Sequence, residues 1–254
     1  QGNMYVLGVT SSANFPTSAL AYQNSFNGGT TVSPDNLKFN GSDIYVLELN
    51  PTGTTLMAST YLGGTGNDGM SFGTLQYNYG DNFRGEIIAD QNFVYFSSVT
   101  QSADFPTVNP SQAAISGSQD AVVVKMTKNL ATLVWSTYYG GSSDETGNGI
   151  ALSGNGSLYV AGGTNSTNLN LGSGGWDASY NSGRDGYVAR FNALTGALMN
   201  GSFIGTADYD QTYFVQVDDD DDVYVLGQTA GNWTISPGCY GNANSGQFMM
   251  KFIP

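Results

Sequence analysis

Five consecutive aspartates at 218–222 form the densest group of ionisable side chains in the sequence. They precede the apolar run VYV at 223–225, which places them in a turn before a short strand. Carboxylates packed this closely repel one another, and their hard oxygen atoms suit Ca²⁺ as a counter-ion. The alternate residues Asp218, Asp220 and Asp222 can converge on one ion, but the run lacks the glycine and the distal glutamate of a helical calcium loop. The pattern leaves two alternatives, a calcium site or a solvated acidic turn.

Little else in the sequence points to a reaction. Histidine is absent, which removes the commonest general base and metal ligand. The single cysteine, Cys239, has no partner for a disulfide within the chain, and we expect it to be half-buried in a loop. Asp144 and Glu145 are adjacent acids of the type that glycoside hydrolysis uses in pairs, yet they lie in a Gly/Ser-rich loop. We therefore predict no catalytic residues, and no cofactor apart from the calcium alternative.

Charge and composition narrow the class of protein. The formal net charge is −13, with only 7 Lys+Arg against 20 Asp+Glu, which excludes a protein that follows nucleic-acid phosphates. No apolar run has the length of a membrane span, so we predict no membrane insertion. Gly accounts for 35 of the 254 residues and aromatic residues for 13%, a mix that favours many short strands with Gly-rich turns.

A stretch of two short strands joined by a turn occurs three times. Apolar and polar residues alternate in each strand, and 20 positions separate the leading Asp from the first Gly of a closing pair. The copies are DIYVLELNPTGTTLMASTYLGG at 43–64, DAVVVKMTKNLATLVWSTYYGG at 120–141 and DGYVARFNALTGALMNGSFIGT at 185–206, with a truncated fourth, GQFMMKFIP, at 246–254. Such self-similarity indicates that one supersecondary unit is stacked along the chain.

A second element precedes each of these hairpins. It is a β-branched and aromatic run followed by Gly or Ser and a polar loop, and its aligned tyrosines are Tyr5, Tyr95, Tyr159 and Tyr224. Before three of these runs lies another short strand, at 85–89, 149–152 and 214–217. The complete unit therefore has four strands, and four short antiparallel strands per repeat are typical of a β-propeller blade.

We predict an all-β fold, a β-propeller of four-stranded antiparallel blades that forms a single domain over 1–254. The blades lie at approximately 1–64, 85–141, 149–206 and 214–254 and contain three, four, four and three strands, so the outer two of the four are incomplete. Closure of a propeller removes exposed strand edges. We therefore expect flanking blades outside this chain to complete a larger ring, such as a seven-bladed one; a four-bladed ring that closes on itself is the alternative.

One position is shared by all four hairpins and carries a charged residue in each. It lies five residues after the leading Asp or its equivalent and is occupied by Glu48, Lys125, Arg190 and Lys251. The change of sign at Glu48 argues against a shared catalytic role, so we expect paired or snorkelling side chains on blade faces. Large aromatic residues of the same hairpins are expected to pack between blades, namely Tyr61, Trp135, Tyr138, Tyr139 and Phe203.

Two insertions distinguish the first half of the chain. Residues 64–84 replace a stretch that is only GSSDETGN in the next blade, and residues 17–42 lengthen the loop before Asp43. Both are polar, rich in Gly and Asn, and contain Tyr and Phe. Inserted loops of propellers collect on a rim and commonly form the binding face, whereas the alternative is tolerated surface decoration.

These repeated residues resemble the bacterial beta-propeller repeat family known as SBBP. The resemblance rests on WSTYYGG at 135–141, STYLGG at 59–64, SADFPT at 102–107 and GIAL at 149–152, and it covers nearly the whole chain. The third unit departs from the pattern, with Leu169 and Asn170 in place of FPT, Gly201 in the Trp/Ser region and Thr206 in place of the second Gly. The resemblance implies a propeller fold and a secreted or surface location, and it implies no reaction.

The last stretch, at 234–252, resembles propeller segments of large surface proteins of Bacteroidetes, which often end in a gliding-motility or type IX secretion sorting domain. By this analogy we expect a non-catalytic binding or adhesion module of a bacterial secreted or cell-surface protein. Its partners would be other domains of a larger chain, or a protein or glycan on a surface, contacted through the inserted loops. A carbohydrate-active propeller enzyme and a purely structural spacer are the alternatives.

Overall fold

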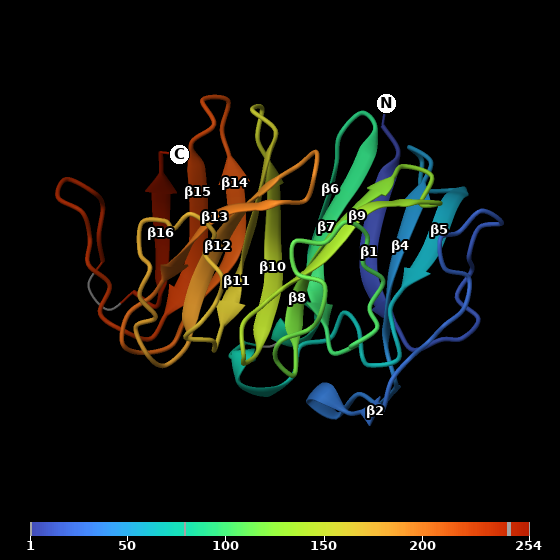
Figure 1. Cartoon of the computed structure of the whole chain (residues 1–254), viewed down its shortest axis with the longest axis horizontal. Helices are drawn as coiled ribbons and strands as arrows, with labels where there is room; N and C mark the ends of the chain where they lie inside the picture. The colour runs from blue at the N-terminus through green and yellow to red at the C-terminus, as the bar shows by residue number, and fades with distance from the viewer. Residues whose placement is uncertain (1, 79, 243–244, 254) are drawn as a thin grey trace.

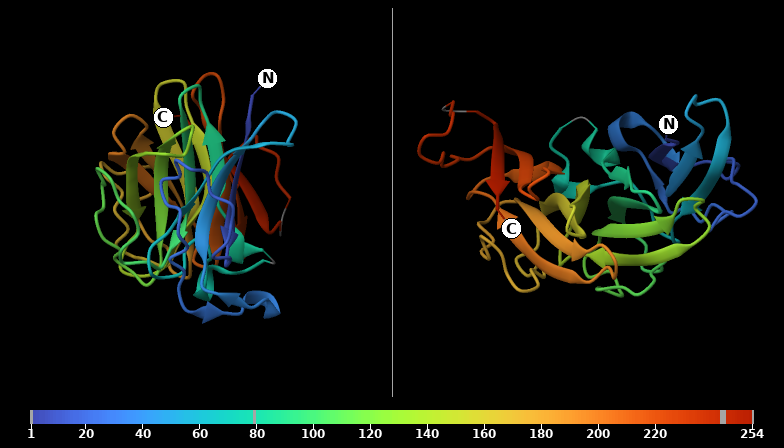
Figure 2. Two further views of the ribbon diagram at one scale, coloured as in Figure 1. Left: turned by 90° about the vertical axis from the view of Figure 1, so that its right-hand side faces the viewer. Right: turned by 90° about the horizontal axis from the view of Figure 1, so that it is seen from above.

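The computed structural model describes residues 2–78, 80–242 and 245–253. Its strands form four antiparallel sheets of three or four strands, which follow one another along an arc, and one separate two-stranded ribbon (Figure 1; Figure 2, right). The first sheet contains β1 (Met4–Thr10), β4 (Asp43–Leu49) and β5 (Leu56–Leu62), and the second β6 (Glu86–Ala89), β7 (Phe93–Thr100), β8 (Asp120–Thr127) and β9 (Leu133–Tyr139). The third contains β10 (Glu145–Leu152), β11 (Ser157–Thr164), β12 (Asp185–Asn192) and β13 (Leu198–Ile204), and the fourth β14 (Asp210–Val217), β15 (Val223–Thr229) and β16 (Gln247–Phe252).

The strand order within each sheet confirms the predicted four-stranded antiparallel arrangement. Consecutive strands pair antiparallel in the orders β6-β7-β8-β9 and β10-β11-β12-β13, and the outer two sheets have three strands each. The predicted leading strands prove longer than expected, because β10 begins at Glu145 and β14 at Asp210. A β-bulge interrupts each of them, at 147–149 and at 212–214, which hides the simple alternation that sequence patterns rely on.

The central strands are buried on both faces, because each inner sheet packs between two others. In β8, Val122 and Val124 contact the first sheet, whereas Ala121 and Val123 contact the third. All four side chains have no exposed surface. The predicted alternation of apolar and polar residues is therefore wrong for this strand, because AVVV is a continuous apolar run with both faces buried.

Three separate apolar cores join neighbouring sheets. The first contains Ile44 and Phe96, the second Tyr139 and Phe191, and the third Ile204. The prediction that large aromatic residues of the hairpins pack between blades is confirmed for Trp135, Tyr138, Tyr139 and Phe203, which are at most 2% exposed and belong to these cores. It is wrong for Tyr61, which is buried against Phe15 and Phe26 of the loop that covers its own sheet. The sheets therefore associate face to face as stacked wedges.

The charged position shared by the hairpins also follows the prediction. Lys125 is 3% exposed, and its Nζ donates to the carbonyl oxygen of Ala193 in the next sheet at 2.8 Å. Arg190 donates from Nε to the hydroxyl of Ser157, and Lys251 pairs with Asp222. In the first sheet, Glu48 accepts hydrogen bonds from the side chains of Tyr5 and Asn3.

Only part of the 17–42 insertion is an addition to the blade. The main-chain N–H groups of Gln23 and Gly28 donate to Thr60 and Asp43, as those of Gln112 and Gly117 donate to Thr137 and Asp120 in the second sheet. Residues 15–28 thus form a loop that covers the first sheet, and the second sheet has an equivalent loop before Asp120. The added part is a small ribbon of β2 (Thr31–Val32) and β3 (Phe39–Asn40), with the 3₁₀ turn η1 (Pro34–Asn36) between them.

The 64–84 insertion interrupts the pairing along one edge of β7 in the second sheet. Asp68 forms an isolated bridge with Thr100 of β7, and the chain returns to pair with β7 only at Glu86. Between them lie two 3₁₀ turns, η2 (Gly73–Leu75) and η3 (Asp81–Phe83). The segment, teal in Figure 2 (right), lies on the concave side of the arc and not on its outer rim.

Cys239 differs from the prediction. It is exposed and free, because the loop between β15 and β16 packs little of its surface against the sheets. Among the described residues, no helix combines the length and the hydropathy that a membrane crossing needs.

Candidate functional site

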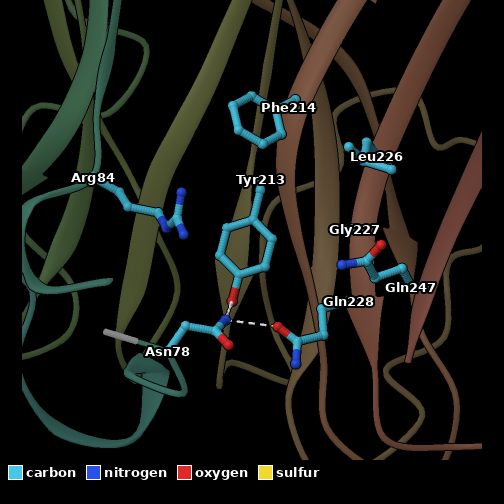
Figure 3. A pocket seen from close by; sticks show the side chains of 8 residues that line it. All are labelled: Asn78, Arg84, Tyr213, Phe214, Leu226, Gly227, Gln228 and Gln247. Atoms are coloured by element: carbon cyan, nitrogen blue, oxygen red, sulfur yellow. Dashed lines mark hydrogen bonds between the residues drawn. The ribbon is translucent and has the colours of Figure 1, made fainter. Parts of the chain in front are cut away.

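A cavity of about 270 Å³ lies between the 64–84 insertion and the strands of the fourth sheet (Figure 3). The insertion supplies two side chains and the fourth sheet supplies the others. The lining residues are Asn78, Arg84, Tyr213, Phe214, Leu226, Gly227, Gln228 and Gln247. Residues far apart in the sequence therefore form one concave surface, the usual form of a small-ligand site.

The bulge in β14 explains why two consecutive residues line this cavity. Neighbouring side chains of a regular strand point to opposite faces. The register shift between Thr212 and Phe214 breaks that alternation, so Tyr213 and Phe214 both reach the cavity. Tyr213 is 6% exposed, whereas Phe214 is 47% exposed and presents its ring to solvent.

Asn78 joins the insertion to the fourth sheet. Its side-chain amide donates to Tyr213 Oη at 2.9 Å and to Gln228 Oε1 at 2.6 Å (Figure 3). Beside it, Tyr77 stacks on Tyr209 with ring centroids 4.4 Å apart. These contacts fix one wall of the cavity against the other.

The positive charge of Arg84 is neutralised within the site. Its Nε donates to Asp81 Oδ1 at 2.7 Å, and the Asp81 side chain has no exposed surface. The guanidinium also lies over the Tyr213 ring, with Cζ 4.2 Å from the centroid. Burial raises the pKa of Tyr213 to about 12, so its hydroxyl stays protonated and neutral near pH 7.

The chemistry of the lining suits a neutral polar ligand. Side-chain amides of Asn78, Gln228 and Gln247 supply both donors and acceptors. The exposed Phe214 ring offers an apolar platform, and the eight lining residues include no carboxylate. Hydroxyl groups and the apolar faces of sugar rings match this combination.

The structure places the predicted calcium ligands in a turn between β14 and β15. Asp218 accepts hydrogen bonds from the main-chain N–H groups of Asp220 and Asp222 and from Tyr224 Oη. Asp222 pairs with Lys251 at 2.5 Å, and Asp221 accepts from the N–H of Gly154. The described part of the chain holds no cluster of three or more acidic, Cys or His side chains with the geometry of a metal site. Calcium binding by this turn therefore stays a prediction, and the contacts above show what already offsets its charge.

Asp144 and Glu145 do not line the cavity, and their surroundings differ. Asp144 is half-buried, whereas Glu145 has no exposed surface and lies beside Asp120, the leading Asp of the preceding hairpin. Burial, with Asp120 nearby, raises the pKa of Glu145 to about 7.

The same arrangement recurs at all three sheet boundaries. Each leading Asp lies next to an acid that opens the following sheet, giving the pairs Asp43 with Asp68, Asp120 with Glu145, and Asp185 with Asp210. All six side chains have no exposed surface. Main-chain N–H groups hold the leading Asp of each pair, for example those of Ser116 and Gly117 on Asp120.

The cavity was not predicted from the sequence, because its residues share no motif. The 64–84 insertion was identified as a candidate binding segment, and it does supply Asn78 and Arg84. Its partners on β14 and β15 could be found only from the arc that brings the fourth sheet round to the insertion. The carboxyl pairs were not predicted from the sequence either, although the leading Asp marks each repeat.

Stacked antiparallel sheets of this kind are the blades of a β-propeller. The comparison with protein families bears this out, since the SBBP beta-propeller repeat matches residues 134–170. The matched segment runs from β9 through β10 and β11 into the loop that follows, and it contains both WSTYYGG and GIAL, on which the resemblance was based, and the divergent residues Leu169 and Asn170. The search of curated proteins gave no match.

Proposed function

We propose that the protein is a non-catalytic binding module of a bacterial secreted or cell-surface protein, and that it takes a neutral glycan in the cavity between the 64–84 insertion and the fourth sheet. The observation that carries this proposal is the pair of hydrogen bonds from Asn78 to Tyr213 and Gln228. Through these bonds the 64–84 insertion, which has no counterpart in the third blade, is fixed to the fourth sheet and completes the cavity beside it.

The ligand class follows from the lining. Three side-chain amides and one exposed ring meet hydroxyl groups and a sugar face, and the single cation, Arg84, is already paired with Asp81. The net charge of −13 disfavours polyanionic glycans by long-range repulsion. Adhesion, gliding motility and type IX secretion remain part of the proposal only through the resemblance to surface propellers.

The test is an array of neutral and acidic oligosaccharides, followed by titration calorimetry of the best neutral binder. Replacement of Phe214 or Gln228 by Ala should weaken binding about tenfold, a loss of about 1.4 kcal/mol. Gln216→Ala is the matched control, since Gln216 is exposed on the same strand but does not line the cavity. Unchanged affinity in both cavity variants would contradict the proposal.

The alternatives give different results in the same experiments. If the protein were an enzyme, mass spectrometry of the incubated glycans would show cleavage that an Asp→Asn change abolishes. If it were a spacer, no oligosaccharide on the array would bind, and replacing 70–84 by a short turn would leave every partner assay unchanged.

A further inference from the structure

The three carboxyl pairs at the sheet boundaries differ in how well their oxygen atoms are satisfied. At the first two boundaries, every carboxyl oxygen accepts at least one hydrogen bond. At the third, Oδ1 of Asp185 and Oδ1 of Asp210 have no hydrogen-bond partner among the described residues, although neither side chain has any exposed surface. A buried carboxyl oxygen without a partner is costly, so a bound group that neutralises it would stabilise the fold.

One donor of the second boundary is replaced by an acid at the third. The side-chain amide of Gln112 donates to Asp120 at 2.7 Å. Asp177 is its counterpart, because both lie eight residues before the leading Asp (120−112 and 185−177). The main-chain N–H of each also donates to a hydroxyl on the fourth strand of its sheet. The Asp177 carboxylate is half-buried and acts electrostatically on Asp185, so negative charge stands where the second boundary has a donor.

A second donor is lost three residues before the leading Asp. The main-chain N–H of Gly117 donates to Asp120 Oδ1 at 3.1 Å. Ser182 holds the corresponding place before Asp185, with a φ of 79°, and no hydrogen bond reaches Asp185 Oδ1. Within the described part of the chain, Asp185 accepts only from Asn181, whose N–H binds Oδ2 at 2.9 Å.

The opposing acid, Asp210, is bound from one side. The N–H and the hydroxyl of Thr206 both donate to its Oδ2. The Thr229 hydroxyl lies near Asp210, but its hydrogen bonds are with the main chain of Gly231. Asp208 adds a further negative charge, and no lysine or arginine of the described residues forms an ion pair with either buried acid. The third boundary therefore gathers acceptors and carboxylates without a cation.

The two buried acids converge on the turn at Gly205 and Thr206. A Cβ built on Gly205 would be 2.6 Å from Asp185 Oδ1, and Thr206 is the residue that binds Asp210. Asp185 belongs to β12 and Asp210 to β14, so the pair spans the interface between the third and fourth sheets. Among the neighbouring charges, Asp210 acts most strongly on Asp185.

We propose that the third boundary binds one Ca²⁺ ion between Asp185 and Asp210. The two carboxylates balance the charge of the ion, and neutral oxygens of the adjacent turn, the Gly205 carbonyl and the Thr206 hydroxyl, are available as further ligands. Ca²⁺ accepts oxygen ligands in a flexible geometry, whereas Mg²⁺ demands a regular octahedron and keeps several waters, which a fully buried pair does not favour. This site is separate from the acidic turn at 218–222 and does not rest on the proposed glycan cavity.

The test uses the variant in which Asp218, Asp220 and Asp222 are changed to Asn, so that the acidic turn cannot contribute. After removal of metal with EDTA, titration calorimetry with CaCl₂ should give a saturable heat with one ion per chain. The Tm should rise by about 5–10 °C when free Ca²⁺ is about a hundred times its Kd. MgCl₂ at the same concentration should give a smaller rise.

Three further changes in this background locate the ion. Asp185→Asn removes one ligand and should weaken Ca²⁺ binding by at least about tenfold. The double change Asp177→Gln with Ser182→Gly restores both donors of the second boundary, so this variant should stay folded by circular dichroism and lose the calcium response. Asp120→Asn, in a pair whose oxygens all have partners, is the matched control and should keep it.

Four results would overturn the proposal. They are the absence of calcium-dependent heat in the starting variant, an equal rise of Tm with MgCl₂, an unchanged response in both the Asp185 and the double variant, and an equal loss in Asp120→Asn.

Discussion

The carboxyl groups of Asp120 and Glu145 lie against the same point, occupied by Gly140. A Cβ built on Gly140 would be 2.5 Å from Cγ of Asp120 and 2.5 Å from Oε2 of Glu145. The first Gly of the repeated closing pair is therefore the residue that lets two acids from neighbouring sheets approach one another. Gly63 has the same relationship to Asp43 and Asp68.

Replacement of Gly140 by Ala should destabilise the fold by about 1–3 kcal/mol, because the added methyl group would push apart buried groups that cannot move into solvent. Chemical denaturation followed by circular dichroism measures this change. Gly154→Ala is the control, since its Cβ would meet only one atom, at 3.5 Å. Equal midpoints for the two variants would contradict the close contact at Gly140.

The carboxyl pairs should make stability fall as pH rises. Burial raises the pKa values of Asp68, Glu145 and Asp185 to about 7 in the folded chain, so the folded state holds protons that the unfolded state has released. Their stabilising contribution is complete below the unfolded pKa near 4 and is lost as pH rises through about 7. Thermal unfolding between pH 4.5 and 8.5 should show a decreasing Tm.

Replacing one of these acids by its amide should reduce that slope, because an amide has no proton to lose. We expect Glu145→Gln and Asp68→Asn to lose less stability between pH 5 and 8 than the wild type. Asp219→Asn, at an exposed position, should keep the wild-type slope. A Tm that rises over this interval in the wild type would show that other groups dominate.

Trp135 should be the most important single aromatic residue at the second boundary. It is 1% exposed, donates to Ala193 and lies against Gly196. Trp135→Ala should cost about 3–5 kcal/mol by leaving a cavity between the second and third sheets. Trp176→Ala provides the comparison, because a ring that is 66% exposed contributes little packing, and its loss should change stability by less than about 1 kcal/mol.

Calcium binding at the acidic turn can be tested directly by titration calorimetry. If Asp218, Asp220 and Asp222 bind Ca²⁺, the wild type should give a saturable heat that the triple Asp→Asn variant lacks. The pairing of Asp222 with Lys251 competes with the ion, so Lys251→Met should strengthen binding. No calcium-dependent heat in the wild type would leave the turn as an acidic one stabilised by its own hydrogen bonds.

The repeated sequence made the fold predictable, but it did not predict the residues of the cavity. The order of strands, the three, four, four and three in the sheets, and the burial of Trp135 all follow from alternation at a fixed period. Bulges at 147–149 and 212–214 concealed the true starts of β10 and β14, because local period breaks leave no pattern. The proposed glycan cavity forms because the arc brings the 64–84 insertion next to the fourth sheet. No motif in the sequence indicates that these two parts of the chain are neighbours.

The two insertions show the same limit in detail. Both were recognisable as extra length, yet residues 15–28 repeat the hydrogen bonds of the loop before Asp120, and only the β2–β3 ribbon is additional. The sequence shows how long the insertions are, whereas the strands that flank them determine on which side of the sheets they lie. The 64–84 segment leaves the edge of β7 after Asp68 and returns to it at Glu86, and the residues between lie on the concave side of the arc (Figure 2, right).

The hydrogen bonds of Asn78 have a consequence for the order of folding. They link residues 135 and 150 positions apart, so they cannot form until the second, third and fourth sheets have all docked. The side-chain amide signals of Asn78 in a nitrogen-labelled sample would therefore be among the last to reach their native positions during refolding. The side-chain signals of Asn78, in the insertion of the second blade, would thus become native only after the fourth blade has docked.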